Sequence, residues 1–278
     1  MKRNGKNSGF SLAEVLMSVG ILAIGMMFIA GVFPAAIYYS TLATERTIAA
    51  TVADEAFSKV AIYGRDPNAV TVPGLVENEI FDFNSLKTVF PGIAKMKANE
   101  FAYPSTDYNI SKKQYCWSAL CRLVNQNKRL MQVTVFVSRK PGSNLIYYKP
   151  RLFDLTKNEY GTVDWDWTAN PLFVNLEWPR PVKVKVSKGA RADILIITNN
   201  EELTFINDGY TVLDNTTGKM YRVLERREDN AIVLDRPWGS GSNPEYVWVV
   251  PAPIGGTGPF IAQGRRPCIA VYQRVMRF

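Results

Sequence analysis

One long apolar segment near the N-terminus constrains this chain more than any other feature. From Val15 to Thr44 the sequence contains no charged residue, and residues 15–37 are strongly apolar. As a helix, residues 15–37 are about 35 Å long, which exceeds the ~30 Å hydrocarbon core of a bilayer. We therefore expect this segment to cross a membrane once, as a single helix.

The charges around the segment predict its orientation. Lys2, Arg3 and Lys6 precede it, and the positive-inside rule places them in the cytoplasm and the chain after about residue 40 on the far side. A secretory signal peptide is the alternative, but its cleavage site follows the apolar run. Pro34-Ala35-Ala36 is a poor site of that kind, and a helical pattern continues beyond it.

Glu14 does not fit a plain membrane anchor, because it lies at the start of the apolar segment. An ionisable residue at membrane depth costs about 2.5–3.5 kcal/mol at the helix centre, and such residues are usually functional. The cost is smaller near the cytoplasmic end, so a tolerated interfacial glutamate is the structural alternative.

The residues around Glu14 favour the functional reading. The stretch Gly9-Phe10-Ser11-Leu12-Ala13-Glu14 follows a short basic leader and directly precedes the apolar helix. It resembles the prepilin signature of the type IV pilin and type II secretion pseudopilin superfamily. The resemblance implies that residues 1–9 are a leader and that prepilin peptidase cuts between Gly9 and Phe10. It also implies that the new amine of Phe10 is N-methylated.

The chemistry of these residues agrees with the roles that the resemblance implies. Gly9 has no Cβ and gives a peptidase close access to the backbone. Phe10 provides an apolar mature N-terminus. A carboxylate in an apolar bundle is costly alone and tolerable when paired, so we expect Glu14 to pair with the Phe10 amine, its own or that of a neighbouring subunit, and to set register during assembly.

The membrane helix also carries small residues and one proline. Val15 begins the strongly apolar part, and Gly20 and Gly25 are among the small residues that allow close helix approach in lipid. Pro34 removes one backbone hydrogen bond, so we expect a kink or local melting there. Apolar residues at three-to-four-residue steps continue to about residue 60. The predicted helix therefore spans residues 10–63.

The rest of the chain reads as β structure. Residues 64–185 are predicted to form a globular head, in which Gln114–Val124 and Leu130–Arg139 make a hairpin. Residues 186–278 contain short strands typical of a small sheet or barrel, ending in a strand over Ile269–Phe278 that could return to the main sheet. The predicted fold class is α+β, with a long N-terminal helix packed on an antiparallel sheet and a β-rich C-terminal subdomain.

Five short strands are expected in that subdomain: Asp193–Thr198, Thr211–Asp214, Met220–Glu225, Ala231–Asp235 and Tyr246–Val250. Turn residues at 207–209, 214–218 and 228–230 separate them. Residues 145–185 show no clear pattern. Upstream, Pro91-Gly92 is expected to form a turn.

Composition argues against an enzyme. The chain has no histidine, which removes the usual general base and the commonest metal ligand. It contains no nucleotide-binding or zinc motif, so we expect no catalytic residues, no metal and no cofactor. Cys116, Cys121 and Cys268 permit a disulfide without implying one. The net charge of +8 is scattered, so no nucleic acid is expected, although a DNA-uptake filament stays open.

The resemblance implies a structural subunit of a type IV pilus or a type II secretion pseudopilus, and the chain length favours a large or minor subunit. The implied partners are prepilin peptidase, other pilin or pseudopilin subunits, the inner-membrane assembly platform and the lipid bilayer. The implied location is the inner membrane with an extracytoplasmic head, then a periplasmic or cell-surface filament. The alternative is a membrane-tethered binding or scaffold protein that does not polymerise.

Overall fold

The computed structural model describes residues 11–64, 79–88, 90–105, 113–125, 129–140, 147, 153–154, 159–160, 178–239, 246–253 and 266–278. By its internal contacts the chain divides into two compact units, Met1–Thr47 and Ile48–Phe278. The predicted division of the head between residues 185 and 186 stays a prediction.

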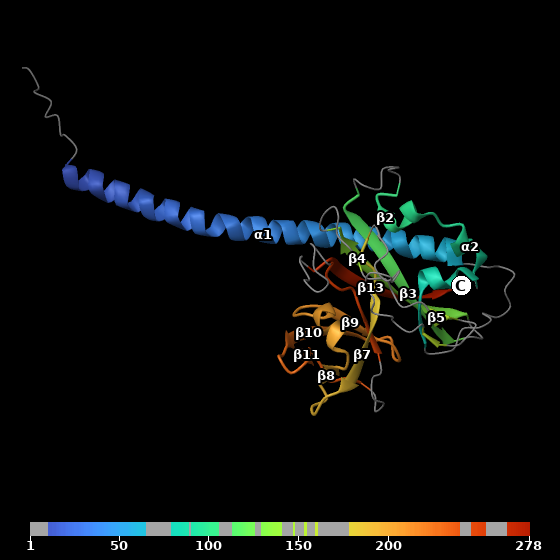
Figure 1. Cartoon of the computed structure of the whole chain (residues 1–278). Coiled ribbons are helices and arrows are strands. Elements are labelled where there is room, and N and C mark those ends of the chain that lie inside the picture. Colours follow the sequence, from blue (N-terminus) through green and yellow to red (C-terminus); the bar gives the residue numbers. More distant parts are fainter. Residues whose placement is uncertain are drawn as a thin grey trace, which may run out of the picture. The chain divides into compact units, whose positions relative to one another are not determined.

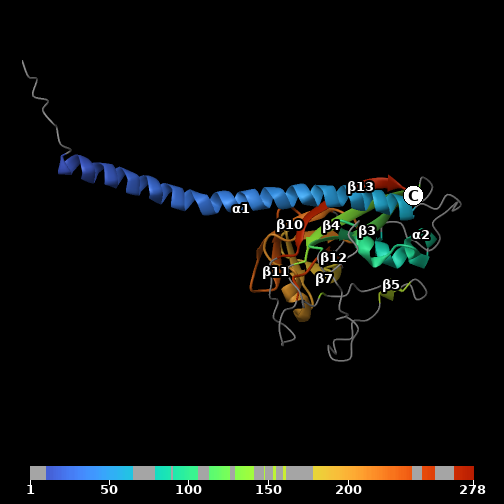
Figure 2. The same ribbon diagram turned by 90° about the horizontal axis from the view of Figure 1, so that it is seen from above.

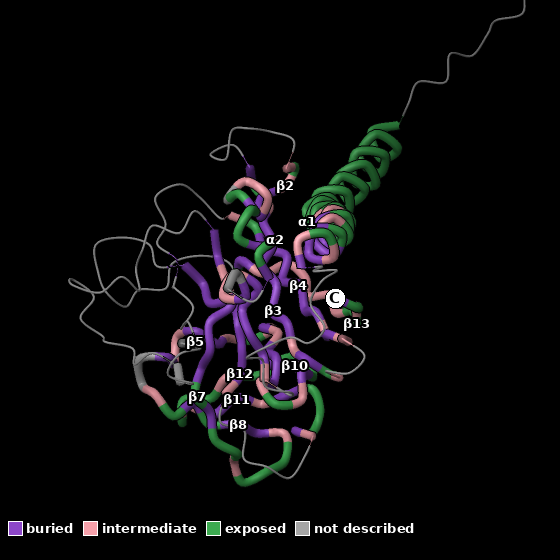
Figure 3. The backbone as a smooth tube through the Cα atoms, turned by 90° about the vertical axis from the view of Figure 1, so that its right-hand side faces the viewer, coloured by how far each residue is buried: buried purple, intermediate pink, exposed green. Residues whose placement is uncertain are grey.

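The predicted long helix is present as α1, which spans Leu12–Gly64 and has 53 residues. It is drawn blue to cyan in Figure 1. The helix continues through Pro34, so the local melting expected at this proline does not occur. Every residue from Ser11 to Thr41 is exposed, and Figure 3 shows this part of the helix in green. An exposed apolar surface of this extent calls for lipid or other helices as its partner.

Within the second unit, one face of α1 is buried in the head. The buried apolar residues recur at helical spacing and are Ala49, Val52, Ala53, Ala56, Phe57 and Val60. They form one core cluster with the buried residues of the main sheet. This part of α1 is therefore a packed core helix, as the predicted α+β fold requires.

The main sheet has the strand order β1-β3-β4-β13, with β2 also paired to β3. Its strands are β1 (Ile80–Asp82), β2 (Ala102–Tyr103), β3 (Tyr115–Asn125), β4 (Leu130–Arg139) and β13 (Cys268–Arg277). The predicted hairpin is confirmed, because β3 and β4 pair antiparallel. The predicted return of the last strand is also confirmed, because β13 pairs antiparallel with β4.

Short elements surround the sheet. They are the 3-10 helices η1 (Phe83–Thr88) and η2 (Ala98–Phe101), helix α2 (Pro91–Ala94) and the small ribbon of β5 (Phe153–Asp154) and β6 (Glu159–Tyr160). The turn expected at Pro91-Gly92 is instead the start of α2. Proline suits the first helical position, where the missing N–H would have no helical partner. A Cβ on Gly92 would lie 2.3 Å from the Tyr63 carbonyl oxygen, so the close packing of α2 on α1 requires glycine there.

The β-rich part after residue 180 closes into a barrel, which is one of the two forms predicted. Its strands are β7 (Val182–Lys188), β8 (Ile194–Ile197), β9 (Thr211–Asp214), β10 (Met220–Arg226), β11 (Ala231–Leu234) and β12 (Tyr246–Val249). The closed order is β10-β11-β8-β7-β12-β9, visible in yellow to orange in Figures 1 and 2. The 3-10 helix η5 (Asn200–Phe205) contacts β7 and β8. Five strands lie where we expected them, whereas β7 was not predicted.

The two faces of the main sheet have different partners. Trp117 and Cys121 belong to the core shared with α1, whereas Leu120 and Phe136 cluster with Leu213 and Trp248 of the barrel. Side chains alternate between faces along a strand, so α1 and the barrel cover opposite faces. This explains why the burial of β3 and β4 is nearly continuous, and Figure 3 shows both strands largely in purple.

One turn of the barrel docks directly on the sheet. Gly218 adopts φ of +69°, and its carbonyl oxygen accepts hydrogen bonds from Gln132 Nε2 at 3.2 Å and Gln273 Nε2 at 2.8 Å. A Cβ on Gly218 would lie 2.4 Å from Gln132 Oε1. Glycine is required here both by the left-handed backbone and by the close approach.

We expect Gly218→Ala to lower the free energy of unfolding by about 2–3 kcal/mol, from the left-handed backbone and the added contact. Gly209→Ala is the matched control, because Gly209 also has positive φ, +76°, but its Cβ would meet nothing closer than 3.6 Å. The control should lose only about 1–2 kcal/mol. Urea unfolding followed by circular dichroism measures both values, and equal losses would contradict the close docking.

A buried lysine ties α1 to the rest of the head. Lys59 of α1 is only 9% exposed. Its Nζ lies 2.7 Å from Glu55 Oε1 and 2.8 Å from Glu100 Oε2, and it donates to the Glu100 carbonyl oxygen at 2.8 Å. Two carboxylates and a carbonyl thus compensate its burial, and they hold α1 against η2.

Candidate functional site

The first turn of α1 holds Glu14 in a capping box. The backbone N–H of Ser11 donates to Glu14 Oε2 at 3.1 Å, and the backbone N–H of Ala13 donates to Ser11 Oγ at 3.2 Å. Serine at the N-cap and glutamate three residues later satisfy two helix-end donors reciprocally. The negative carboxylate also lies at the positive end of the helix dipole.

Glu14 therefore has a structural role within its own helix. Sequence reasoning assigned it only to assembly, and it assigned no role to Ser11. The signal was available, because Ser-x-x-Glu before an apolar run is the signature of a capping box. The helix cap and the predicted pairing with an amine are compatible, because a carboxylate that accepts one backbone N–H can still accept a hydrogen bond from a second donor.

The other predicted site residues lie along the exposed helix or outside the described residues. Gly9 and Phe10 fall outside the described residues. Val15 is 48% exposed on the first turns of α1. A Cβ on Gly20 or Gly25 would meet nothing within 4 Å, so both leave open notches on the helix surface. The roles of these residues stay predictions.

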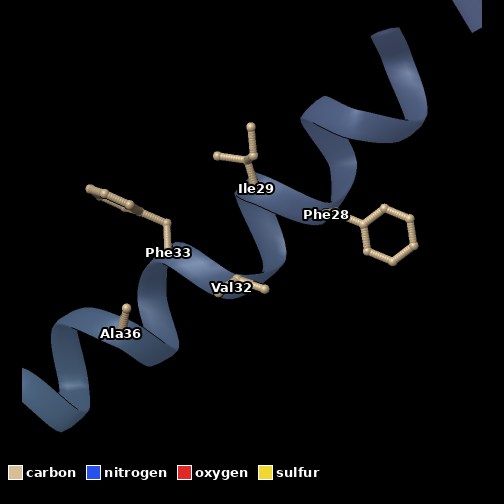
Figure 4. Close-up of a pocket in the computed structure, with 5 residues that line it drawn as sticks. All are labelled: Phe28, Ile29, Val32, Phe33 and Ala36. Atoms are coloured by element: carbon tan, nitrogen blue, oxygen red, sulfur yellow. The ribbon is translucent and has the colours of Figure 1, made fainter. Parts of the chain in front are cut away.

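A shallow apolar groove runs along the same helix surface. It is lined by Phe28, Ile29, Val32, Phe33 and Ala36, which occupy three successive turns in Figure 4. No polar side chain contributes to the lining. Such a surface can receive acyl chains or apolar side chains of another helix, and it has no means of orienting a polar substrate.

The three cysteines are free, and the sheet separates them. Cys116 and Cys268 both pair with Ser138, from opposite sides of β4, so two strand spacings of about 4.8 Å lie between them. Cys121 follows Cys116 on β3, five residues further along. These separations exceed the distance that a disulfide spans, so no disulfide joins the three within one chain.

Burial also raises the pKa of these thiols. It raises the pKa of Cys116 and of Cys121 well above the ordinary value, and it raises the pKa of Cys268 to about 12. The folded chain therefore keeps its thiols protonated in a pH range where those of the unfolded chain ionise. A protonated thiol is neither a nucleophile nor a good metal ligand.

We expect the contribution of the buried thiols to the free energy of unfolding to be constant below about pH 8.5. Above that pH the free energy of unfolding should fall. Each buried thiol adds a slope of up to about 1.4 kcal/mol per pH unit, because only the unfolded chain loses the proton. Urea unfolding between pH 7.5 and 9.5 measures the slope. In Cys121→Ala the slope should be smaller by one thiol. A slope equal to that of the wild type would contradict a raised pKa at Cys121.

Polar groups buried in the head take part in fold contacts. Glu202 is 1% exposed and accepts the backbone N–H of Lys185 at 2.9 Å. Asp214 is 2% exposed and accepts the backbone N–H of Thr216 at 2.9 Å, forming an Asx turn. Across the described ranges, no three Cys, Asp or Glu residues gather in an arrangement that could hold a metal ion.

Comparison with known proteins identifies the N-terminal segment. Residues 4–30 match the family model described as the prokaryotic N-terminal methylation motif, the signature of pilin- and pseudopilin-type prepilins. No curated protein and no solved structure matches the chain. α1 is also the helix that is long and apolar enough to cross a membrane in the part of the chain that the structure describes.

The chain therefore carries a prepilin-type methylation motif that extends into α1. The motif belongs to a family of structural proteins, and together with α1 it fits a protein anchored in the membrane by a single helix. The methylation motif covers the segment that includes Gly9, Phe10 and Glu14.

Proposed function

We propose that this chain is a structural subunit of a type IV pilus or type II secretion pseudopilus, matured by prepilin peptidase. The proposal rests on one observation. The methylation motif over residues 4–30 occurs together with an apolar helix that is entirely exposed from Ser11 to Thr41. In this proposal the exposed helix is buried twice, first in the bilayer and then among the helices of other subunits.

Maturation changes the chemistry at the end of this helix. Cleavage after Gly9 creates a positively charged amine at Phe10, four residues before Glu14. In a bundle of apolar helices, the Glu14 carboxylate of an incoming subunit and the Phe10 amine of its neighbour neutralise each other. The inner-membrane assembly platform would add such subunits one at a time, through a heterologous contact that does not close.

The head supports a large or minor subunit. The barrel and α1 cover opposite faces of the main sheet, so neither face is free for contacts with another subunit. Among the described residues, head contacts are then left to the outer barrel surface, the edges of the sheet and the exposed side of α1. The barrel lies in the chain between β4 and β13, which are adjacent strands, and this connectivity suits a module displayed from a simpler helix-and-sheet core.

A crosslinking experiment tests the proposal against a tethered protein that does not polymerise. Benzoylphenylalanine replaces Phe28, which is 71% exposed on α1, and separately Leu224, which is 56% exposed on the barrel. After irradiation and shearing, the Phe28 probe should join the chain to other pilin-type subunits in the released filaments. If the chain stays in the membrane and the Phe28 probe yields no subunit adduct, the filament proposal is wrong.

A further inference from the structure

Hydrophobicity alone does not determine how deep α1 sits in a bilayer. The chain is free of charge from Val15 to Thr44, which as a helix is about 45 Å, whereas the hydrocarbon core is ~30 Å thick. The surplus of about 15 Å corresponds to almost three helical turns. A helix with this much surplus can slide or tilt unless another feature of the chain sets its depth.

The polar residues beyond the apolar run do little to remove this freedom. Thr41 Oγ1 donates to the Ile37 carbonyl oxygen at 2.9 Å, and Thr44 Oγ1 donates to the Ser40 carbonyl oxygen at 2.9 Å. Hydroxyl donors that are bonded within the helix lower the cost of leaving water. The turn that carries them is therefore compatible with water and with the outer part of a bilayer.

Two tyrosines lie where the apolar run ends. Tyr38 and Tyr39 directly follow Ile37, and their exposed fractions are 64% and 66%. Their rings meet edge to face, with centroids 5.6 Å apart and planes at 71°. Adjacent residues point about 100° apart around a helix, so the pair presents two phenol hydroxyls on a broad sector of one turn.

We propose that Tyr38 and Tyr39 bind the lipid headgroup boundary on the extracytoplasmic side and set the depth of α1 before assembly. The inference rests on the membrane anchor of the proposed function and adds residues to which that function assigns no role. A tyrosine places an apolar ring beside acyl chains and a hydroxyl among headgroups, and tyrosine is enriched at membrane interfaces for this reason.

A depth measurement on the full chain in phosphatidylcholine–phosphatidylglycerol vesicles tests the inference. A nitroxide attached through Ala35→Cys reports depth from its relative exposure to oxygen and to a water-soluble nickel chelate. The background carries Cys268→Ala, because Cys268 is half-buried while Cys116 and Cys121 are buried. The Cys268→Ala protein without Ala35→Cys should take up no label, which verifies that Cys116 and Cys121 do not react with the nitroxide reagent.

The test variant is Tyr38→Phe with Tyr39→Phe, which keeps both rings and removes both hydroxyls. We expect the nitroxide to move deeper by about 3 Å, the rise of two helical residues. Tyr38→Trp with Tyr39→Trp keeps a polar N–H on each ring and should leave the depth unchanged. Phe33→Leu removes a ring that has no polar group, so it should also leave the depth unchanged.

Two results would overturn the inference in distinguishable ways. If the phenylalanine pair leaves the nitroxide at the depth of the unsubstituted chain, the tyrosines do not set the depth, and the membrane anchor stands. If the nitroxide on the unsubstituted chain is as exposed to the nickel chelate as a label in water, α1 does not enter the bilayer. In that case the anchor of the proposed function fails and the depth inference fails with it.

Discussion

Replacing Glu14 with leucine is expected to lower the fraction of this chain found in sheared filaments about 100-fold. The reason is the Phe10 amine of the neighbouring subunit, which would be left without its counter-charge in an apolar bundle. An uncompensated charge in such surroundings costs about 3 kcal/mol, and each 1.4 kcal/mol is a factor of ten. Immunoblots of the sheared and membrane fractions measure the effect.

The capping box found in the structure requires two further variants, which separate the effect of the cap from the effect of the charge. Glu14 Oε2 accepts the backbone N–H of Ser11, so Glu14→Leu removes both a cap and a charge. Glutamine also forms a capping box, but it carries no charge. If charge pairing drives assembly, Glu14→Gln should fail nearly as badly as Glu14→Leu, whereas Ser11→Ala should assemble within a few-fold of wild type.

The opposite ranking would contradict the pairing role. If Glu14→Gln assembles normally while Glu14→Leu and Ser11→Ala are both impaired, the carboxylate acts only as a helix cap. The expected loss from removing a cap is about 1 kcal/mol. Each variant needs a measurement of its intact mass, so that an uncleaved leader is not mistaken for a failure of assembly.

The second large effect is expected from Trp117, which lies at the centre of the core between α1 and the main sheet. It is 1% exposed, and its ring centroid lies 4.9 Å from that of Phe101 and 6.3 Å from that of Phe83. Its Nε1–H donates to the Glu100 carbonyl oxygen at 3.0 Å. Trp117→Ala should therefore lower the free energy of unfolding by about 3–5 kcal/mol.

Trp117→Phe separates the ring from its hydrogen bond. Phenylalanine keeps most of the aromatic packing, and the Glu100 carbonyl oxygen retains the hydrogen bond from Lys59 Nζ, so no buried acceptor is left without a donor. We expect a loss of about 1–2 kcal/mol. Urea unfolding of the full chain in detergent, followed by near-ultraviolet circular dichroism, compares the two. A loss below 1 kcal/mol for Trp117→Ala would show that the site is not packed as described.

Local patterns in the sequence were sufficient for the long helix, the central hairpin, five barrel strands and the last strand. The hairpin of β3 and β4 and five barrel strands follow from alternation between turn residues, and the turns do contain left-handed residues, namely Gly209, Gly218 and Asn230. Strand β7 was missed although Val182–Lys188 alternates apolar and polar residues. The segment before it showed no clear pattern, so no turn marked where this strand begins.

Contacts between distant parts of the chain could not be predicted. The burial of Lys59 depends on Glu100, which is 41 residues away, and no local pattern in the helix indicates this partner. The closure of the barrel depends on β12 pairing with both β7 and β9. Neither pairing is marked by a turn, because the partner strands are not neighbours in the sequence.

The sequence was sufficient to identify the candidate site, but the prediction of its geometry was incomplete. The residues from Gly9 to Glu14 and the helix after them were sufficient to indicate a prepilin-type protein, and the family model over residues 4–30 agrees. The capping by Ser11 has a sequence signature that was overlooked. The tyrosine pair was overlooked for a different reason, since its significance appears only when the whole uncharged length of residues 15–44 is compared with the thickness of a bilayer.

The measurement that tests the central claim most directly is the intact mass and N-terminal sequence of the chain extracted from its native membrane. A prepilin-type subunit is expected to begin at N-methylated Phe10, without the nine leader residues. A chain that still begins at Met1, in cells with an active prepilin peptidase, would contradict maturation as a filament subunit. The protein would then be an uncleaved membrane-tethered protein.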